Sequence, residues 1–266
     1  MQFSHPSRRS LIRHSWIAFV VAPIGVAVLW QILAAAHAYD QSIVPSPFTI
    51  LRAVFALARE GFLLSDIAAT VTRVLIGYSI AVIAGFAAGL CTGLSALFRF
   101  LAEPLLQIGR PIPALALVPL AISWFGIGEF SKLFIVVWAA FYPIWINTHV
   151  GVQQTPTELL WTAALLGADS RRTVIEVVIP SSVVYLLSGA RIGLGLAFAA
   201  TVVAEMSGAD SGLGYRVFVN HLVFRFDRMI GGILIIGLLG ATIDRIYVWL
   251  TFRIFPWTRR QLNEQK

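Results

Sequence analysis

Long stretches without a charged side chain dominate this sequence and restrict what it can fold into. A helix that spans a lipid bilayer needs about 20 predominantly apolar residues. Six such stretches follow one another along the chain: His14–Tyr39, Val74–Phe98, Pro111–Gly128, Leu133–Thr157, Val177–Ala204 with Arg191 inside it, and Met229–Ile243, which Ile246–Phe252 extends. The pattern predicts an all-α integral membrane protein with six transmembrane helices.

Composition supports this class over a soluble one. Hydrophobic residues make up 58% of the 266 residues and charged residues 12%, whereas a soluble domain carries about 25% charged residues. A formal charge of +7 would suggest nucleic-acid binding in a soluble protein. Here the basic residues mostly flank apolar runs, which is typical of topology-setting charges and of anionic lipid headgroups, so we expect a lipid bilayer as partner and no nucleic acid.

The number of spans and the basic residues together predict the topology. Six spans place both termini on one side, and basic residues are more frequent in the segments on that side. The positive-inside tendency then makes that side the cytosol. We expect three regions: residues 1–66 with a cytosolic tail, the first transmembrane helix and a periplasmic segment; residues 67–252 as a core of five transmembrane helices; and residues 253–266 as a cytosolic tail.

Two N-terminal patterns resemble export signals. Ser7–Leu11 contains a twin-arginine pair, and Ala36–Ala38 looks like a signal-peptidase site. The apolar run between them is about 20 residues, however, and a signal peptide has an apolar region of only about 7–15 residues. We therefore interpret this segment as a retained first helix.

Small residues and prolines mark the second and third spans. Gly85 and Gly89 form a small-xxx-small pair that permits close helix approach. This pair is equally consistent with packing inside one subunit and with contact in a dimer. Prolines remove backbone donors and bend helices, which suits either a cavity lining or simple packing. Those of the third span are Pro104, Pro111, Pro113 and Pro119.

The stretch between the fourth and fifth spans is too polar to cross a membrane, yet it carries regular helix signals. Thr155 as N-cap, Pro156 at the first helical position and Glu158 at the third predict a capping box. Gly167 should end this helix after about Leu166. Asp169 or Ser170 should then cap a second short helix. Pro180 should mark the entry to the next span.

Two short helices joined by a tight turn are suited to docking another protein. Leu159, Ala163 and Leu166 share one face of the first helix at i, i+4, i+7 spacing. A membrane-surface elbow, with Arg171 and Arg172 at the lipid headgroups, is the alternative.

The spacing within this segment is similar to that of a known family. Ala163, Gly167, Val177, Ile179 and Pro180 reproduce the motif of ABC importer permeases: Glu-Ala-Ala, three residues, Gly, nine residues, then Ile-x-Leu-Pro. Further pieces resemble the nitrate, sulfonate and taurine branch of that family: Val44–Pro47, Gly109–Pro113, Pro119–Leu120, Trp124–Gly128, Pro143, Asn147–Thr148, Gly151, Gly189–Arg191, Val203–Glu205 and Gly212–Tyr215. The resemblance covers nearly the whole chain from Val44 to Asp244.

This resemblance implies a type I ABC importer permease fold and the role of transmembrane permease subunit in an ATP-driven importer. A homodimer of this chain, two ABC ATPase subunits and a periplasmic solute-binding protein would complete that importer in the bacterial inner membrane. Residues 155–180 would contact the ATPase. The coupling residues implied are Glu158, Trp161, Ala163, Gly167, Ala168, Val177, Ile179 and Pro180.

One position departs from the family motif. Trp161 stands where the family usually has Glu, so the acidic contact to the ATPase is missing there. Either Glu158, one turn earlier, substitutes for it, or Trp161 makes an apolar contact instead.

Polar residues in or beside the spans are candidates for a translocation path, because ionisable groups at membrane depth are costly and often functional. The path candidates are Arg110, Asn147 and Glu205. We expect Arg110 near the cytosolic interface and Glu205 at the outer end of its helix. Asp244 and the adjacent Arg245 would instead support packing near the inner face.

Several chemical functions are excluded by what the sequence lacks. Its two lysines, Lys132 and Lys266, do not follow a Gly-x-x-x-x-Gly pattern, so we expect no phosphate-binding loop. The single Cys91 excludes an intramolecular disulfide, and no metal-ligand cluster or nucleophile motif is present. We expect no catalysis and no cofactor in this chain, with ATP hydrolysed by the partner subunit.

A secondary transporter not coupled to an ATPase is the alternative. Such a protein should show an internal inverted repeat and more buried ion-coupling carboxylates, and neither is visible. The resemblance implies a small polar or anionic solute, such as a sulfonate, taurine or nitrate, without choosing among them.

Overall fold

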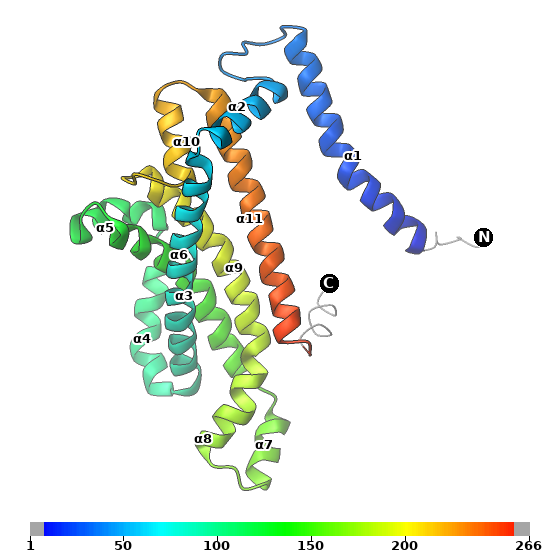
Figure 1. The fold of residues 1–266 in the computed structure, drawn as a ribbon. Coiled ribbons are helices and arrows are strands. Elements are labelled where there is room, and N and C mark those ends of the chain that lie inside the picture. Colours follow the sequence, from blue (N-terminus) through cyan, green and yellow to red (C-terminus); the bar gives the residue numbers. More distant parts are fainter. Residues whose placement is uncertain (1–7, 258–266) are drawn as a thin grey trace.

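The structure, a computed structural model, describes the backbone of residues 8–257 and the side chains of residues 21–257. Residues 1–7 and 258–266, parts of the two expected cytosolic tails, lie outside it. Helices make up nearly all of the described chain (Figure 1). They are α1 (Arg8–Ala35), α2 (Pro47–Arg59), α3 (Phe62–Leu94), α4 (Ala96–Gly109), the 3₁₀ helix η1 (Ala114–Leu117), α5 (Val118–Phe125), α6 (Glu129–Gln153), α7 (Thr157–Leu165), α8 (Ser170–Thr173), the π helix η2 (Val174–Val178), α9 (Ile179–Met206), α10 (Leu213–Leu222) and α11 (Phe226–Ile254).

Four described helices are long and apolar enough to cross a membrane: α3, α6, the continuous segment Ser170–Met206, and α11. The bent pair of α4 and η1–α5 makes a fifth if it is one span, and α1 supplies a shorter apolar helix over Val21–Ala35. The predicted all-α membrane class is confirmed. A sixth crossing by α1 stays a prediction.

The third span differs from the expected one. The sequence analysis begins the third span at Pro111, bent by its prolines, and assigns Arg99 and Arg110 to the cytosolic segment before it, and this starting point is wrong. The helix α4 already begins at Ala96, and α5 runs at 90° to it after a break (Figure 1). Arg110 still has helical geometry, with φ −56° and ψ −44°, but Pro111 and Pro113 lack the backbone donors that would continue the helix, so it ends at Gly109 and the chain turns.

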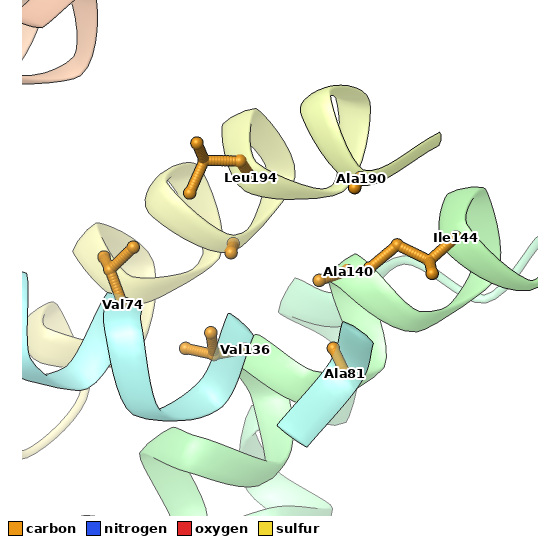
Figure 2. Packing of buried hydrophobic residues seen from close by; sticks show 8 residues of the cluster. Val74, Ala81, Val136, Ala140, Ile144, Ala190 and Leu194 are labelled. Atoms are coloured by element: carbon orange, nitrogen blue, oxygen red, sulfur yellow. The ribbon is translucent and has the colours of Figure 1, made fainter. Parts of the chain in front are cut away.

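The core lies where α3, α6 and α9 pack together (Figure 2). Its buried side chains are mostly small: Val74, Ala81, Val136, Ala140, Ile144, Ala190, Leu194 and Ala197. A Cβ atom on Gly85 would lie 2.9 Å from the Ile144 side chain, and one on Gly89 would collide with Thr148. The small-xxx-small pair therefore serves packing of α3 on α6 within one subunit.

The bundle has two distinct ends. At one end, α2 and α10 lie beside the first turns of α3 and α11; we call this the α10 end (Figure 1). From the opposite end project α7, α8 and η2, residues 157–178, which we call the elbow (Figure 1). The helix α1 stands apart from the bundle and contacts α2.

Candidate functional site

The elbow begins differently from the expected capping box. Its first helix starts at Thr157, and the preceding Pro156 makes no side-chain cap. The Thr155 hydroxyl donates instead to the Val152 carbonyl at 2.9 Å, at the end of α6. Because Pro156 rather than Thr155 is the N-cap and no side chain caps this end, the predicted box is wrong. Glu158 is exposed in the first turn of α7, where a negative charge favours the helix N-terminus.

The turn between α7 and α8 is built on Gly167, as the sequence predicts. This residue has φ +75°, a conformation that glycine adopts at little cost. The Ala168 N–H donates to the Ala163 carbonyl at 3.0 Å, the long bond of a Schellman motif. Of the two expected caps of α8, Asp169 is the one used, since its carboxylate accepts from the Arg172 N–H at 2.8 Å.

The elbow continues into α9 without a break, and Ser170–Met206 forms one helical segment of 37 residues. A π turn joins the two parts, and in it the Ile179 N–H bonds to the Val174 carbonyl. Pro180 has no N–H for the carbonyl four residues earlier, and the wider turn lies directly before it. Val177 and Ile179 are half-buried, while Pro180 is exposed. No break therefore separates α8 from α9.

Large apolar side chains cover the outer surface of the elbow. Leu165 is 88% exposed, Leu166 82% and Trp161 66%, whereas Ala163 is buried. Of the three residues expected to share one face, Leu159, Ala163 and Leu166, Ala163 is buried and the two leucines are exposed. Gathered apolar groups of this kind mark an interaction surface.

Beside these side chains lies a groove of mixed charge. Its volume is about 550 Å³, and its lining residues are Gly167, Asp169, Arg171, Arg172, Ile175 and Glu176. Arg172 and Glu176 form an exposed ion pair at 3.6 Å. The elbow thus offers a partner both an apolar contact and charged groups.

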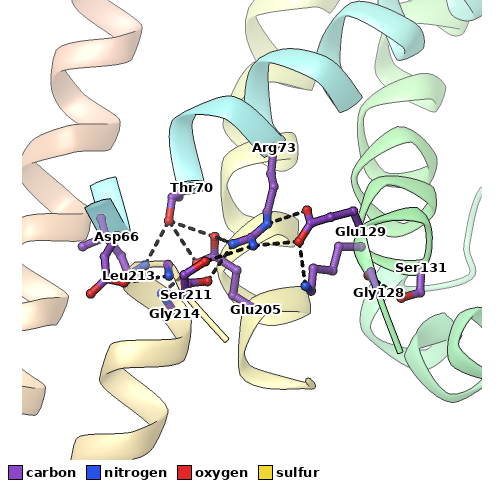
Figure 3. Close-up of polar contacts among 12 residues, drawn as sticks. Asp66, Thr70, Arg73, Gly128, Glu129, Ser131, Glu205, Ser211, Leu213 and Gly214 are labelled. Atoms are coloured by element: carbon purple, nitrogen blue, oxygen red, sulfur yellow. Dashed lines mark hydrogen bonds and ion pairs between the residues drawn. The ribbon is translucent and has the colours of Figure 1, made fainter. Parts of the chain in front are cut away.

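At the opposite, α10 end, Glu205 is the centre of a buried polar cluster (Figure 3). Its carboxylate has 0% exposure and accepts from Arg73 Nη1 at 2.8 Å, the Thr70 hydroxyl at 2.9 Å and the Gly214 N–H at 2.9 Å. A solute could reach Glu205 only if this cluster opened. The placement therefore adds no support to the predicted path role of Glu205.

The cluster extends across α3, α6 and α10. Arg73 forms a bidentate pair with Glu129, with both distances 2.8 Å, and Lys132 bonds to the same carboxylate at 2.9 Å. Asp66 accepts from Arg216 at 2.7 Å. The sequence analysis missed this cluster. The available signal was that charges of both signs gather in the segments expected outside the membrane, but their pairing required the fold.

The two other path candidates occupy different surroundings. Arg110 is exposed in the turn after α4 and lines a cavity with Trp138 and Tyr142, near the middle of α6. The expectation that it lies near the cytosolic end is therefore wrong. Asn147 is half-buried, donates to the Pro143 carbonyl at 2.8 Å, and does not line that cavity.

Comparison with known proteins places this arrangement in a family. Residues 77–256 match the family described as binding-protein-dependent transport system inner membrane component. The chain is 34% identical over 242 residues to a putative ABC transporter permease protein of Methanocaldococcus jannaschii, covering 89% of this chain and 90% of the relative. It is 30% identical to the taurine transport system permease protein TauC of Escherichia coli, covering 86% and 85%. It is also 30% identical to the nitrate import permease protein NrtB of Synechocystis, covering 90% and 93%.

The fold agrees with a solved structure as well. The crystal structure of an amino acid ABC transporter with histidines superposes with a TM-score of 0.60 at 15% identity. The match covers 77% of this chain and 96% of that one. At this identity the likeness concerns the arrangement of helices.

Proposed function

Because the chain belongs to the family of binding-protein-dependent transport system inner membrane components, we propose that it forms half of the translocation path of an ATP-driven importer for a small polar or anionic solute. It is a multi-pass membrane protein and a permease subunit. In this proposal a second copy completes the path, and both copies lie in a bacterial inner membrane with their termini in the cytosol.

The elbow is the observation that carries the proposal. It presents three strongly exposed apolar side chains, Trp161, Leu165 and Leu166, beyond the end of the bundle. Apolar side chains exposed in this way would be stabilised by a partner groove that removes them from water. We assign this partner as a separate ABC ATPase, with one ATPase subunit for each copy of the permease. Glu158, next to Trp161 on α7, supplies the acidic contact in this assignment.

The mechanism follows from the continuity of α8 with α9. When the two ATPase subunits close on ATP, each docked elbow moves with its ATPase. The movement passes into α9, which packs closely on α6 because a Cβ atom on Gly193 would lie 3.0 Å from the Ala140 carbonyl. The three core helices then rotate together and switch the path from inward-facing to outward-facing, so that a binding protein can deliver solute.

ATP is bound and hydrolysed by the partner in this proposal. The chain contributes no cofactor site and no catalysis; its work is to couple nucleotide-driven closure to helix movement. The solute class is drawn from relatives named for taurine and nitrate import. Both solutes are small and carry an oxyanion group, so a sulfonate, taurine, nitrate or similar solute is proposed here.

Co-purification with the cognate ATPase tests the proposal. Native chain should retain the ATPase in detergent, whereas Leu166→Asp should lose it, because the aspartate places a charge on the apolar docking surface. Gly167→Asp should act likewise, since it also strains the turn at φ +75°. Leu222→Asp is the matched control: Leu222 is an exposed leucine at the α10 end.

Each outcome is informative. Loss of ATPase with Leu166→Asp but not with Leu222→Asp supports docking at the elbow. If the native chain retains no ATPase, the proposal fails and a secondary transporter becomes the better interpretation. If both leucine variants retain the ATPase, docking takes place elsewhere on the chain.

A further inference from the structure

A cavity lies against the middle of α6, where the chain turns between α4 and η1. Its volume is about 480 Å³, and the residues that define its chemistry are Arg110, Trp138, Tyr142, Pro143, Ile146 and Leu196. Aromatic and aliphatic walls with one charged group make a site suited to a small ligand that has an anionic head and an apolar remainder.

The turn that carries Arg110 is fixed on α6. Trp138 Nε1 donates to the Ile112 carbonyl at 3.3 Å. On the other side of Arg110, Gly109 is buried against the Tyr142 hydroxyl, and a Cβ atom there would collide with it. With Pro111 restricting the backbone as well, the backbone that carries Arg110 beside the cavity is fixed on both sides of this residue.

The charge of Arg110 is not neutralised within the described residues. Arg73 and Lys132 pair with Glu129, and Arg191 pairs with Asp244. Arg110, in contrast, has no carboxylate within 4.0 Å in residues 21–257, and its hydrogen-bond partner there is the Gln107 amide at 3.4 Å. An uncompensated charge at membrane depth is costly and favours a functional assignment.

A polar face of α4 leads from the elbow end of the bundle to Arg110. Arg99, Glu103, Gln107 and Arg110 follow one another at intervals of four, four and three residues, the spacing of one helix face. A second hollow of about 440 Å³ runs along this face, with Arg99, Glu103 and Gln107 among its lining residues. Glu103 lies about 10 Å before Arg110 along the helix, so Arg110 is the charged group at the cavity itself.

We propose that Arg110 is an anion-binding group of the translocation path, and that this cavity holds the oxyanion head of the solute against the guanidinium. A planar guanidinium matches a sulfonate, carboxylate or nitrate through paired N–H donors. A short aliphatic tail would lie against Pro143, Ile146 and Leu196. This inference rests on the proposed function, because it specifies which solutes the path accepts.

Charge-selective labelling of a cysteine in the cavity tests this inference. In a Cys91→Ala background, Ile146→Cys places one thiol in the cavity of the full chain in lipid nanodiscs, with and without ATPase. The measurement is the ratio of labelling rates for the anionic 2-sulfonatoethyl and the cationic 2-(trimethylammonium)ethyl methanethiosulfonates. Arg110→Gln should lower this ratio about tenfold, because a fixed charge concentrates counter-ions in a cleft. Arg110→Lys should retain most of it.

The control is Arg52→Gln, which removes the same charge from the exposed surface of α2 and should leave the ratio unchanged. Methanesulfonate at millimolar concentration should slow anionic labelling of the chain with Arg110 but not of the Arg110→Gln variant. An unchanged ratio in Arg110→Gln overturns the inference. Leu196→Cys provides a second thiol position if Ile146→Cys does not fold. Since labelling needs no ATPase, its result is independent of whether the elbow docks one.

Discussion

The guanidinium of Arg191 on α9 forms a bidentate ion pair with the carboxylate of Asp244 on α11, with Nε–Oδ1 and Nη2–Oδ2 distances of 2.8 Å. The sequence analysis associated Asp244 with the adjacent Arg245 and with packing near the inner face. The structure adds the partner that the sequence analysis did not name: Asp244 contacts Arg191 on another helix. Two charges inside apolar helices thereby neutralise each other.

This pair should stabilise the contact between α9 and α11. Asp244→Asn leaves Arg191 without a carboxylate and should lower the free energy of unfolding by about 1 kcal/mol, a value typical of polar contacts between membrane helices. The exchanged pair Arg191→Asp with Asp244→Arg should recover most of the loss. Thermal unfolding in detergent, treated as a double-mutant cycle, measures the coupling. Equal losses in the single and exchanged variants would contradict a pairwise interaction.

Glu205 should be far more important for stability than a surface carboxylate. Glu205→Ala leaves the buried Arg73 with Glu129 as its remaining carboxylate and removes the acceptor of the Gly214 N–H. We expect a loss of about 3 kcal/mol, the scale for breaking a buried pair. Glu176→Ala, whose pair with Arg172 is exposed, should cost less than about 1 kcal/mol. Chemical unfolding of both variants in the same detergent compares them.

Gly212 should not tolerate a side chain. Its φ is +122°, and a Cβ atom there would collide with the Glu205 carboxylate. Gly212→Ala should therefore destabilise the α10 end by more than about 1 kcal/mol. Gly237→Ala in α11 is the control, because no atom lies within 4 Å of its added Cβ and alanine favours a helix. A similar melting temperature for the two variants would show that the α10 end adapts.

Trp161 should be a principal contact of the elbow with its ATPase. Trp161→Ala should weaken the association by at least about 2 kcal/mol, roughly thirtyfold in Kd, because buried tryptophans dominate many interfaces. Trp249→Ala on α11 is matched in exposure, at 62% against 66%, and should have no effect. Titration of labelled ATPase against nanodisc-embedded chain measures both. Trp161→Glu tests which kind of contact this position makes. Weaker association would indicate an apolar contact, whereas unchanged association would indicate that the ATPase accepts the acidic side chain that the family usually has here.

Local signals in the sequence were enough to predict several features of the structure. The charge-free runs predicted a helical membrane protein because apolar length is a property of consecutive residues. Gly167 and Asp169 predicted the turn and cap of the elbow, since both act through backbone geometry and hydrogen bonds within a few residues. The motif spacing from Ala163 to Pro180 identified the family before any contact between distant parts of the chain was known.

Other features depended on groups that are distant in sequence. The pairs Arg73–Glu129 and Arg191–Asp244 join residues that are 56 and 53 positions apart in the sequence. From the sequence, Arg110 and Glu205 were both candidates for the translocation path. Only the tertiary structure distinguished their surroundings. Glu205 is enclosed by donors from α3 and α10, whereas Arg110 opens into a cavity without a carboxylate beside it among the described residues. A charge is structural or available to a ligand according to what surrounds it, and the folded chain supplies those surroundings.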